Sequence, residues 1–383
     1  MKKPVKDMSL MQAESENIVL FYPHVSELAK KSVMETLDSR WIGQGPKVKL
    51  FEENFSKKFA SNSPAIAVGS GTDALHLSYM LAGLKPGDEV IAPVFTCTAT
   101  NIPFLYMGVK IKFADIDVST MNIDTNHVRQ LMSDKVKAII CVHYGGLPCD
   151  MNELKSIADE SNIPIIEDAA HAVGAKYKGV DIGSISDFTM FSFQAIKHIT
   201  TGDGGMLIIK DKELVDKAER IRWFGIDRKA KQEGIWENDI LEIGYKYQMT
   251  DIAAAMGIVS LDEFDDQSKL RKILFQTYAE ELANCDRLRV VGSGFTDREH
   301  AAWLFTVIVE DRYKLQEKLR DNKIESNQVH FRNDRYSIFK EFTDGKKFPN
   351  MDKVEDDYLV LPLHTKMTVE DVKRVCSVIK SGW

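Results

Sequence analysis

The sequence has few cysteines and no long apolar run. Its five cysteines are widely spaced among 383 residues without a C-x-x-C pair, so neither a disulfide framework nor a zinc site is indicated. The longest apolar runs, such as residues 137–142, are far too short to cross a bilayer, and the first residues lack the apolar segment of a signal peptide. We therefore expect a cytoplasmic protein that binds no metal and no membrane.

Clusters of positive charge are also missing. The formal net charge is -7, and the 50 lysines and arginines are spread along the chain. This distribution argues against nucleic acid as a partner. The chain is longer than a usual single domain, so we expect one large domain and a smaller one.

Short apolar runs alternate with longer amphipathic segments in the first two thirds of the chain. Between the first two runs, Leu77, Leu81 and Leu84 recur at helical spacing. Such alternation predicts an α/β domain with a mostly parallel central sheet. The runs of strand length are residues 65–68, 89–92, 109–113, 136–142, 163–166, 188–191 and 205–209.

The pattern changes near residue 262. A long charged helical stretch over 261–282 leads to a strand-like run at 303–309, and helical patterns follow at 313–322 and 369–379. These segments predict a smaller α+β domain. We place an N-terminal tail at residues 1–17, the large domain at 18–262 and the small domain at 263–383.

A Gly-Ser-Gly-Thr turn at residues 69–72 joins a predicted strand to a predicted helix. Small residues let the backbone approach a ligand, and the free N–H groups of a helix N-terminus favour a phosphate. Such turns also join strands to helices where no ligand binds. The turn alone therefore leaves both interpretations open.

Two further residues lie where a ligand is expected. Asp168 ends an apolar strand, at the edge where open α/β sheets bind ligands; taken alone, it favours a cap of a following helix. Lys197 lies between an apolar strand and a glycine-rich turn. Near a low-dielectric interior the pKa of its amine would fall, and the amine would become a nucleophile. The alternative is an ordinary surface lysine beside a tight turn. Pyridoxal phosphate needs a phosphate cradle, a carboxylate for its pyridine nitrogen and a lysine for its aldehyde. One cofactor thus accounts for all three features.

The chain resembles the DegT/DnrJ/StrS family of sugar aminotransferases, which are pyridoxal phosphate enzymes of fold type I. The resemblance extends over nearly the whole chain and is weakest in the C-terminal part. The matching motifs occur in family order at residues 41–46, 69–72, 86–91, 115–117, 143–146, 167–171, 191–206 and 244–251.

The resemblance implies a role for each matching residue. Lys197 matches the lysine that holds the cofactor and moves a proton, and Asp168 matches the partner of the pyridine nitrogen. His171 stands where many members have a glutamine that faces the cofactor's ring oxygen. The residues that match the phosphate-binding cradle are Gly71, Thr72, Asp73 and Ser192.

Two positions depart from the family pattern. Cys97 stands where the family usually has an aromatic residue that stacks on the pyridine ring. Either the Cys97 thiol packs on that ring or Phe95 covers the ring instead. The alternative is that Cys97 only fills the apolar core. Lys246 replaces an asparagine that reaches the cofactor phosphate of a neighbouring subunit. Its cationic amine could meet the same phosphate, or form an interface salt bridge.

The resemblance also implies substrate-binding residues. Trp41 belongs to a matching motif, and Arg222 could meet a carboxylate or diphosphate, with a surface ion pair as its alternative. His330 resembles the family's histidine near the sugar or nucleotide, and a structural histidine is as consistent with the sequence.

By family analogy we expect a homodimer with a shared active site. Glutamate would donate an amino group to a nucleotide-linked keto-deoxy sugar, expected at carbon 4, with Lys197 as acid and base. The product would serve a surface polysaccharide such as O-antigen, or a natural product. Two alternatives remain. One is a sugar dehydratase, which has a histidine at the position of the lysine; here that position is Lys197, and His198 follows it. The other is a non-catalytic regulator that retains the fold.

Overall fold

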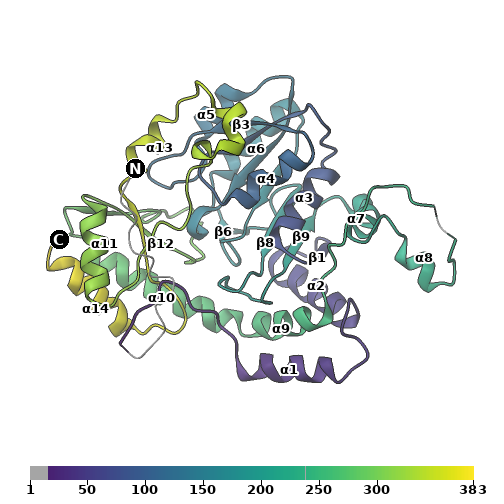
Figure 1. The fold of residues 1–383 in the computed structure, drawn as a ribbon, viewed down its shortest axis with the longest axis horizontal. Coiled ribbons are helices and arrows are strands. Elements are labelled where there is room, and N and C mark those ends of the chain that lie inside the picture. Colours follow the sequence, from purple (N-terminus) through teal and green to yellow (C-terminus); the bar gives the residue numbers. More distant parts are fainter. Residues whose placement is uncertain (1–15, 238) are drawn as a thin grey trace.

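Seven strands form the central sheet of the large domain in this computed structural model, which describes residues 16–237 and 239–383 (Figure 1). Their order is β1 (Ala65–Val68), β9 (Gly205–Ile209), β8 (Phe188–Ser192), β5 (Ile165–Asp168), β4 (Val136–Val142), β2 (Glu89–Pro93) and β3 (Lys110–Ala114). Strand β9 runs antiparallel to β1 and β8, whereas the other neighbours pair in parallel. The predicted α/β class with a mostly parallel sheet is confirmed.

Helices cover both faces of this sheet because its strands bury apolar side chains on both sides. In β4, Ala138 and Ile140 belong to one apolar cluster, while Ile139 and Cys141 belong to the other. The first face packs against α3 (Gly71–Leu81), α4 (Thr98–Tyr106) and α7 (Val215–Arg222). The second face packs against α2 (Pro46–Phe59), α5 (Thr125–Leu131), α6 (Met151–Ser161) and α9 (Asp251–Asp262).

Several shorter elements lie outside this sandwich. Helix α1 (Glu27–Leu37) packs against α9, and α8 (Arg228–Gln232) stands away from the body of the domain (Figure 1). A small separate sheet consists of β11 (Arg298–Glu299), β6 (Lys176–Tyr177) and β7 (Val180–Asp181). Because β11 follows α10 in the chain, this sheet joins the two domains.

The small domain contains a three-stranded antiparallel sheet in the order β10 (Leu288–Val290), β12 (Phe305–Val309) and β13 (Tyr358–Leu361). Its apolar core is shared with α10 (Phe264–Leu282), α11 (Arg312–Asp321) and α14 (Val369–Lys380). The short helices α12 (Lys340–Thr343) and α13 (Pro349–Val354) instead pack against the large domain, where Met351 and Val354 join the apolar cluster of its sheet. The single helical stretch predicted at 261–282 is two helices, because Glu263 forms a turn between α9 and α10.

The beginning of the described chain packs with its end. Ile18 pairs with Ile324 in a parallel bridge and lies in the apolar core of the small domain. The Leu20 N–H donates to Glu325 at 2.7 Å. This contact joins the predicted start of the large domain, at residue 18, to the small domain, and the domain boundaries stay predictions. The predicted tail at 1–17 lies almost entirely outside the described residues.

The parallel strands β2, β4, β5 and β8 end at one edge of the sheet, so the segments that follow them are neighbours. This edge carries the segments that the sequence singled out after β5 and β8. Along the described residues, no helix combines the length and the apolar character needed to cross a membrane.

Candidate active site

The N-terminus of α3 forms one side of the candidate site. Ser70 caps this helix, because its hydroxyl accepts a hydrogen bond from the Asp73 N–H at 3.0 Å. Gly71 begins the helix next to Ser192 at the end of β8: a Cβ atom on Gly71 would lie only 3.0 Å from the Ser192 Cβ. The N–H groups of a first helical turn, here including that of Thr72, have no partner within the helix and favour an anion. The turn and the serine hydroxyl thus fit a phosphate.

Asp168 is buried at the end of β5. Its carboxylate accepts hydrogen bonds from the Thr100 hydroxyl at 2.7 Å and from the Ala170 N–H at 3.1 Å. Burial raises the pKa of this carboxyl group, and the two donors oppose that rise. The chain continues from Asp168 through turns to β6, so the residue does not begin a helix as the capping interpretation required.

Lys197 lies in the turn after β8, and its side chain is partly exposed. Burial lowers the pKa of its amine to about 8, while the carboxylate of Asp168 opposes this change. The Nζ atom lies 3.7 Å from the ring centroid of Trp303. An amine with this pKa is available in its neutral, nucleophilic form near neutral pH.

His198 faces away from Asp168. Its ring Nε2 lies 2.8 Å from the Ala301 carbonyl oxygen, which accepts the imidazole N–H. Its ring centroid lies 6.3 Å from that of Phe264, at the start of α10. Of the two neighbours, Lys197 is therefore the residue directed into the site.

Two imidazoles face each other across the domain junction. The rings of His171 and His330 are stacked, with centroids 5.3 Å apart and an angle of 4° between the planes. Their Nε2 atoms lie 3.5 Å apart. Burial lowers the pKa of His330 to about 3 and that of His171 well below its usual range, so both rings are neutral at pH 7.

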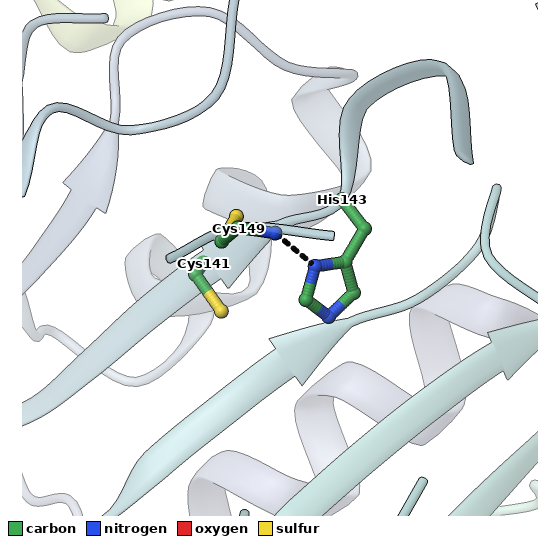
Figure 2. A group of neighbouring side chains, drawn as sticks. All are labelled: Cys141, His143 and Cys149. Carbon is green, nitrogen blue, oxygen red and sulfur yellow. Dashed lines mark hydrogen bonds between the residues drawn. The ribbon is translucent and has the colours of Figure 1, made fainter. Parts of the chain in front are cut away.

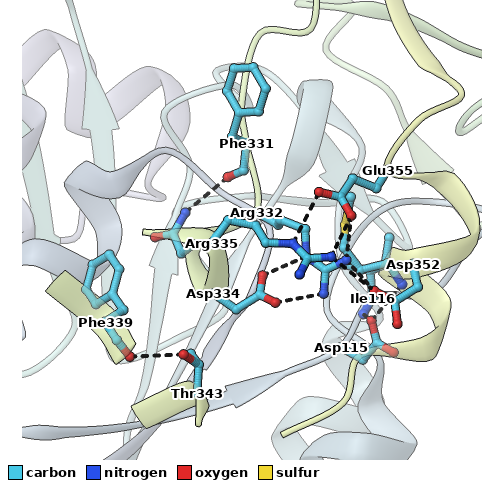
Figure 3. Close-up of polar contacts among 12 residues, drawn as sticks. Asp115, Ile116, Phe331, Arg332, Asp334, Arg335, Phe339, Thr343, Asp352 and Glu355 are labelled. Carbon is cyan, nitrogen blue, oxygen red and sulfur yellow. Dashed lines mark hydrogen bonds and ion pairs between the residues drawn. The ribbon is translucent and has the colours of Figure 1, made fainter. Parts of the chain in front are cut away.

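The His330 segment carries the polar network that Figure 3 shows, which reaches the large domain where the Asp115 carboxylate accepts the Asn350 and Met351 N–H groups at 2.8 and 3.0 Å. Arg332 is buried and pairs with Asp334 at 2.6 Å, with Glu355 at 3.0 Å and with Asp352. Next to it, the Asn333 side chain donates to the Thr96 carbonyl oxygen at 2.8 Å. These contacts place His330 over the loop that follows β2.

In the loop after β2, Phe95 and Cys97, the two residues predicted as possible covers for the cofactor ring, have different surroundings. Phe95 is buried against Tyr144 and Tyr358, at centroid distances of 5.1 and 5.2 Å. Cys97 is exposed at the start of α4 and is close enough to Lys197 to raise the pKa of that amine. Phe95 is thus held in the core, and Cys97 is the one of the two that faces the site.

Three predicted residues lie apart from this group within the described chain. Arg222 is buried and pairs with Glu52 at 2.6 Å, so the ion pair proposed as its alternative exists but is internal rather than at the surface. Trp41 is exposed and lies near Arg222 along one groove. Lys246 is exposed, donates to the Gln248 side chain and lies 5.7 Å from the Phe224 ring centroid.

Sequence reasoning missed Trp303 and Thr100. Trp303 lies under Lys197 but comes from a segment 106 positions later in the chain, so no local pattern connects them. Thr100 is three residues after Cys97, in the first turn of α4, and its hydroxyl donates to Asp168. Its place just after Cys97 was the signal that could have indicated a role in the site.

Cys141, His143 and Cys149 form a buried cluster at the end of β4, the one group of three or more such residues in the described ranges whose donor atoms are close enough to hold a metal (Figure 2). Both ring nitrogens of His143 are engaged: Nδ1 accepts the Cys149 N–H at 3.0 Å, and Nε2 lies 2.8 Å from the Glu167 carboxylate. The histidine therefore acts as a hydrogen-bonding support for the strand that carries Asp168.

The sequence profile of the DegT/DnrJ/EryC1/StrS aminotransferase family matches residues 23–380. The chain belongs to this family. It is therefore a pyridoxal phosphate-dependent sugar aminotransferase.

Two curated proteins are similar to this aminotransferase over most of its length. GDP-perosamine synthase of Escherichia coli O157:H7 is 35% identical over 318 residues, covering 82% of this chain and 85% of that protein. Spore coat polysaccharide biosynthesis protein SpsC of Bacillus subtilis strain 168 is 33% identical over 384 residues, covering 97% and 98%.

Solved structures of sugar aminotransferases share the fold of this aminotransferase. CalS13 from Micromonospora echinospora is 30% identical with a TM-score of 0.90, covering 96% of this chain and 100% of that one. Putative sugar aminotransferase Spr1654 from Streptococcus pneumoniae, solved in a PLP form, is 29% identical with a TM-score of 0.89, covering 95% and 98%.

Proposed function

We propose that this aminotransferase moves an amino group from glutamate to carbon 4 of a nucleotide-linked keto-deoxy sugar. The observation that carries the proposal is the convergence of Lys197, Asp168 and the α3 N-terminus at one edge of the sheet. The similarity to GDP-perosamine synthase, whose name refers to a nucleotide-linked amino sugar, supports the substrate class.

Each group of the site has one task in this reaction. Pyridoxal phosphate, when bound, supplies an aldehyde that accepts the amino group and a ring that withdraws electrons. Asp168 holds the proton on the pyridine nitrogen, and Thr100 keeps the carboxylate oriented. The N–H groups at the start of α3 and the Ser192 hydroxyl bind the phosphate. Lys197 holds the cofactor and carries the proton between donor carbon, acceptor carbon and cofactor.

The substrate side is formed by residues nearer the small domain. The neutral rings of His171 and His330 present N–H donors to the cofactor's ring oxygen and to the sugar. Cys97 faces the site near Lys197, where its polarisable thiol would pack on the cofactor ring in place of an aromatic residue.

We propose a homodimer in which each subunit completes the site of the other. Large apolar side chains are exposed on α1, on the loop after it and on the segment after α7: Met34, Leu37, Trp41, Ile42, Phe224, Trp236, Leu241 and Ile243. An exposed apolar surface of this extent is typical of an interface. Lys246 is exposed beside Phe224 of this surface, and its amine, which here donates to Gln248, would reach the cofactor phosphate of the partner copy as a cation. Sedimentation velocity is expected to give twice the mass of one chain.

The proposed reaction also suggests a use for its product in the cell. A 4-amino-deoxy sugar made in the cytoplasm would be a building block for a surface polysaccharide such as O-antigen, and the similarity to a spore coat polysaccharide protein supports this role. The orientation of His198 toward Ala301 speaks against the dehydratase alternative. The intact set of Asp168, Ser192 and Lys197 speaks against a non-catalytic regulator.

The experiment combines a spectrum with covalent labelling. The purified protein is expected to absorb visible light with bound cofactor, borohydride should fix the cofactor on Lys197 in peptide mass mapping, and glutamate should bleach the band. A panel of nucleotide-linked 3-keto and 4-keto sugars should then restore it with the 4-keto sugars. Labelling of Lys197 without bleaching by glutamate would refute the donor, and restoration by 3-keto sugars would refute the position of amination.

A further inference from the structure

Trp303 is nearly completely buried, with 1% of its surface exposed, just before β12. Its indole N–H donates to the Ile196 carbonyl oxygen at 3.2 Å. Ile196 directly precedes Lys197 in the chain. This hydrogen bond therefore fixes the indole, which comes from the small-domain side, against the backbone of the turn that carries the lysine.

Two groups of the site lie against the indole ring. The Lys197 Nζ is 3.7 Å from its centroid, and the His171 ring is stacked on it with centroids 3.7 Å apart and planes inclined by 18°. Two groups this close to one centroid would overlap if they shared a face, so they occupy opposite faces. The face of an indole attracts an ammonium group more strongly than that of any other side-chain ring.

We propose that Trp303 is a positioning residue for the transamination, holding the Lys197 amine on one face of its indole and the His171 imidazole on the other. This inference rests on the proposed function, in which Lys197 holds the cofactor. The indole fixes the approach of the amine to the cofactor aldehyde and stabilises its charged form. It also keeps the His171 ring in the orientation in which that ring stacks on His330.

Other charged and titratable groups also face the lysine. Asp168 at the end of β5 and Cys97 at the start of α4 raise the pKa of the Lys197 amine, against the effect of burial. The imidazoles of His171, across the indole from the lysine, and of His330 are neutral rings. Asp168 is held by Thr100 and Ala170 and not by Trp303, and the His171 ring, which the indole does hold, is neutral. We therefore expect a change in the titration of Lys197 in a Trp303 variant to report on the indole.

The test follows the capture of pyridoxal phosphate by cofactor-free protein, because only the neutral amine attacks the aldehyde. The rate is measured by stopped-flow absorbance from about pH 6 to 10 for the unmodified protein and for Trp303→Leu. Loss of the indole is expected to lower the midpoint of the rate profile by about 0.5 to 1.5 pH units, from the usual strength of a desolvated cation–ring contact.

Two further variants control for packing. Trp303→Phe keeps an aromatic face with weaker attraction, and its midpoint should fall between those of the other two proteins. Phe21→Leu alters a ring that stacks on Trp303 at 5.7 Å, and it should leave the midpoint unchanged. If Trp303→Leu does not fold, as judged by its thermal unfolding, the Trp303→Phe profile decides the question in the same direction.

An unchanged or raised midpoint in the Trp303 variants would overturn the inference. That result is distinguishable from failure of the proposed function, because borohydride would still fix the cofactor on Lys197. If instead Lys197 of the unmodified protein is not labelled, the proposed function fails and the inference fails with it.

Discussion

The large-domain side of the site consists of short segments at the ends of neighbouring strands, whereas the small-domain side consists of single residues held by contacts between distant parts of the chain. Asp168, Ser192 and Lys197 lie within 30 positions of one another. His330 and Trp303 reach the same place through the Arg332 network and the bond to Ile196. Groups that bind the cofactor are thus specified locally, while groups that shape the space around it depend on tertiary structure.

The largest loss of activity should come from substitutions on the large-domain side of the site. Lys197→Ala removes the nucleophile and the proton carrier together, so we expect kcat to fall at least about 10³-fold in a coupled assay of amination. Lys155→Ala, at an exposed lysine that pairs with Asp159 across one helical turn, is the matched control and should keep full activity. A residual rate within tenfold of the unmodified protein would show that another group moves the proton.

The network that holds the small-domain side should be the next most sensitive. Arg332→Met leaves buried Asp334 without its cationic partner, and we expect the free energy of unfolding to fall by about 3 to 5 kcal/mol in urea titrations. Arg335 shares Glu355 with Arg332 but has an exposed side chain, so Arg335→Met should cost less than about 1 kcal/mol. Equal losses would contradict the distinction between the two arginines.

A smaller change sharpens the role of Asp168. Thr100→Val removes a hydroxyl that donates to the carboxylate at 2.7 Å, which raises the pKa of Asp168 further. A hydrogen bond to a charged group is worth about 1.5 to 3 kcal/mol, so cofactor affinity should fall roughly 10- to 150-fold in fluorescence titrations. Thr100→Ser keeps the hydroxyl and should retain affinity close to normal; an equal loss in both variants would assign the effect to packing.

The smallest effect concerns the pH dependence of stability. Burial lowers the pKa of His330 to about 3 from 6.5, so between these values the unfolded chain binds a proton that the folded chain does not, and stability rises with pH. His330→Asn should reduce that slope by up to about 1.4 kcal/mol per pH unit in urea titrations from about pH 4.5 to 6.

His300 provides the comparison for this variant. Burial also lowers its pKa to about 3, but it packs on Phe275, at a centroid distance of 4.5 Å, away from the site. His300→Asn should therefore reduce the slope as His330→Asn does while leaving turnover unchanged. If both variants lose turnover alike, the position of His330 over the site has no special role in the reaction.

The sequence predicted the strands and the residues at their ends because apolar runs and turn residues are local signals. It did not indicate that β9 runs antiparallel, since an apolar run carries no direction. The sequence offered Arg222 as a substrate-binding residue or a member of a surface ion pair; its buried partner Glu52 was not evident because it is 170 positions away. Trp303 was missed for the same reason: its contacts with Lys197 and His171 exist only after the two domains pack.

The bridge between Ile18 and Ile324 has a consequence for biosynthesis. Leu20 and its partner Glu325 are separated by 305 residues, so at a translation rate of roughly 5 to 20 residues per second the first waits about 15 to 60 s for the second. During that interval the N-terminal segment lacks its partners in the small domain, although the strands around Asp168 and Lys197 are already made.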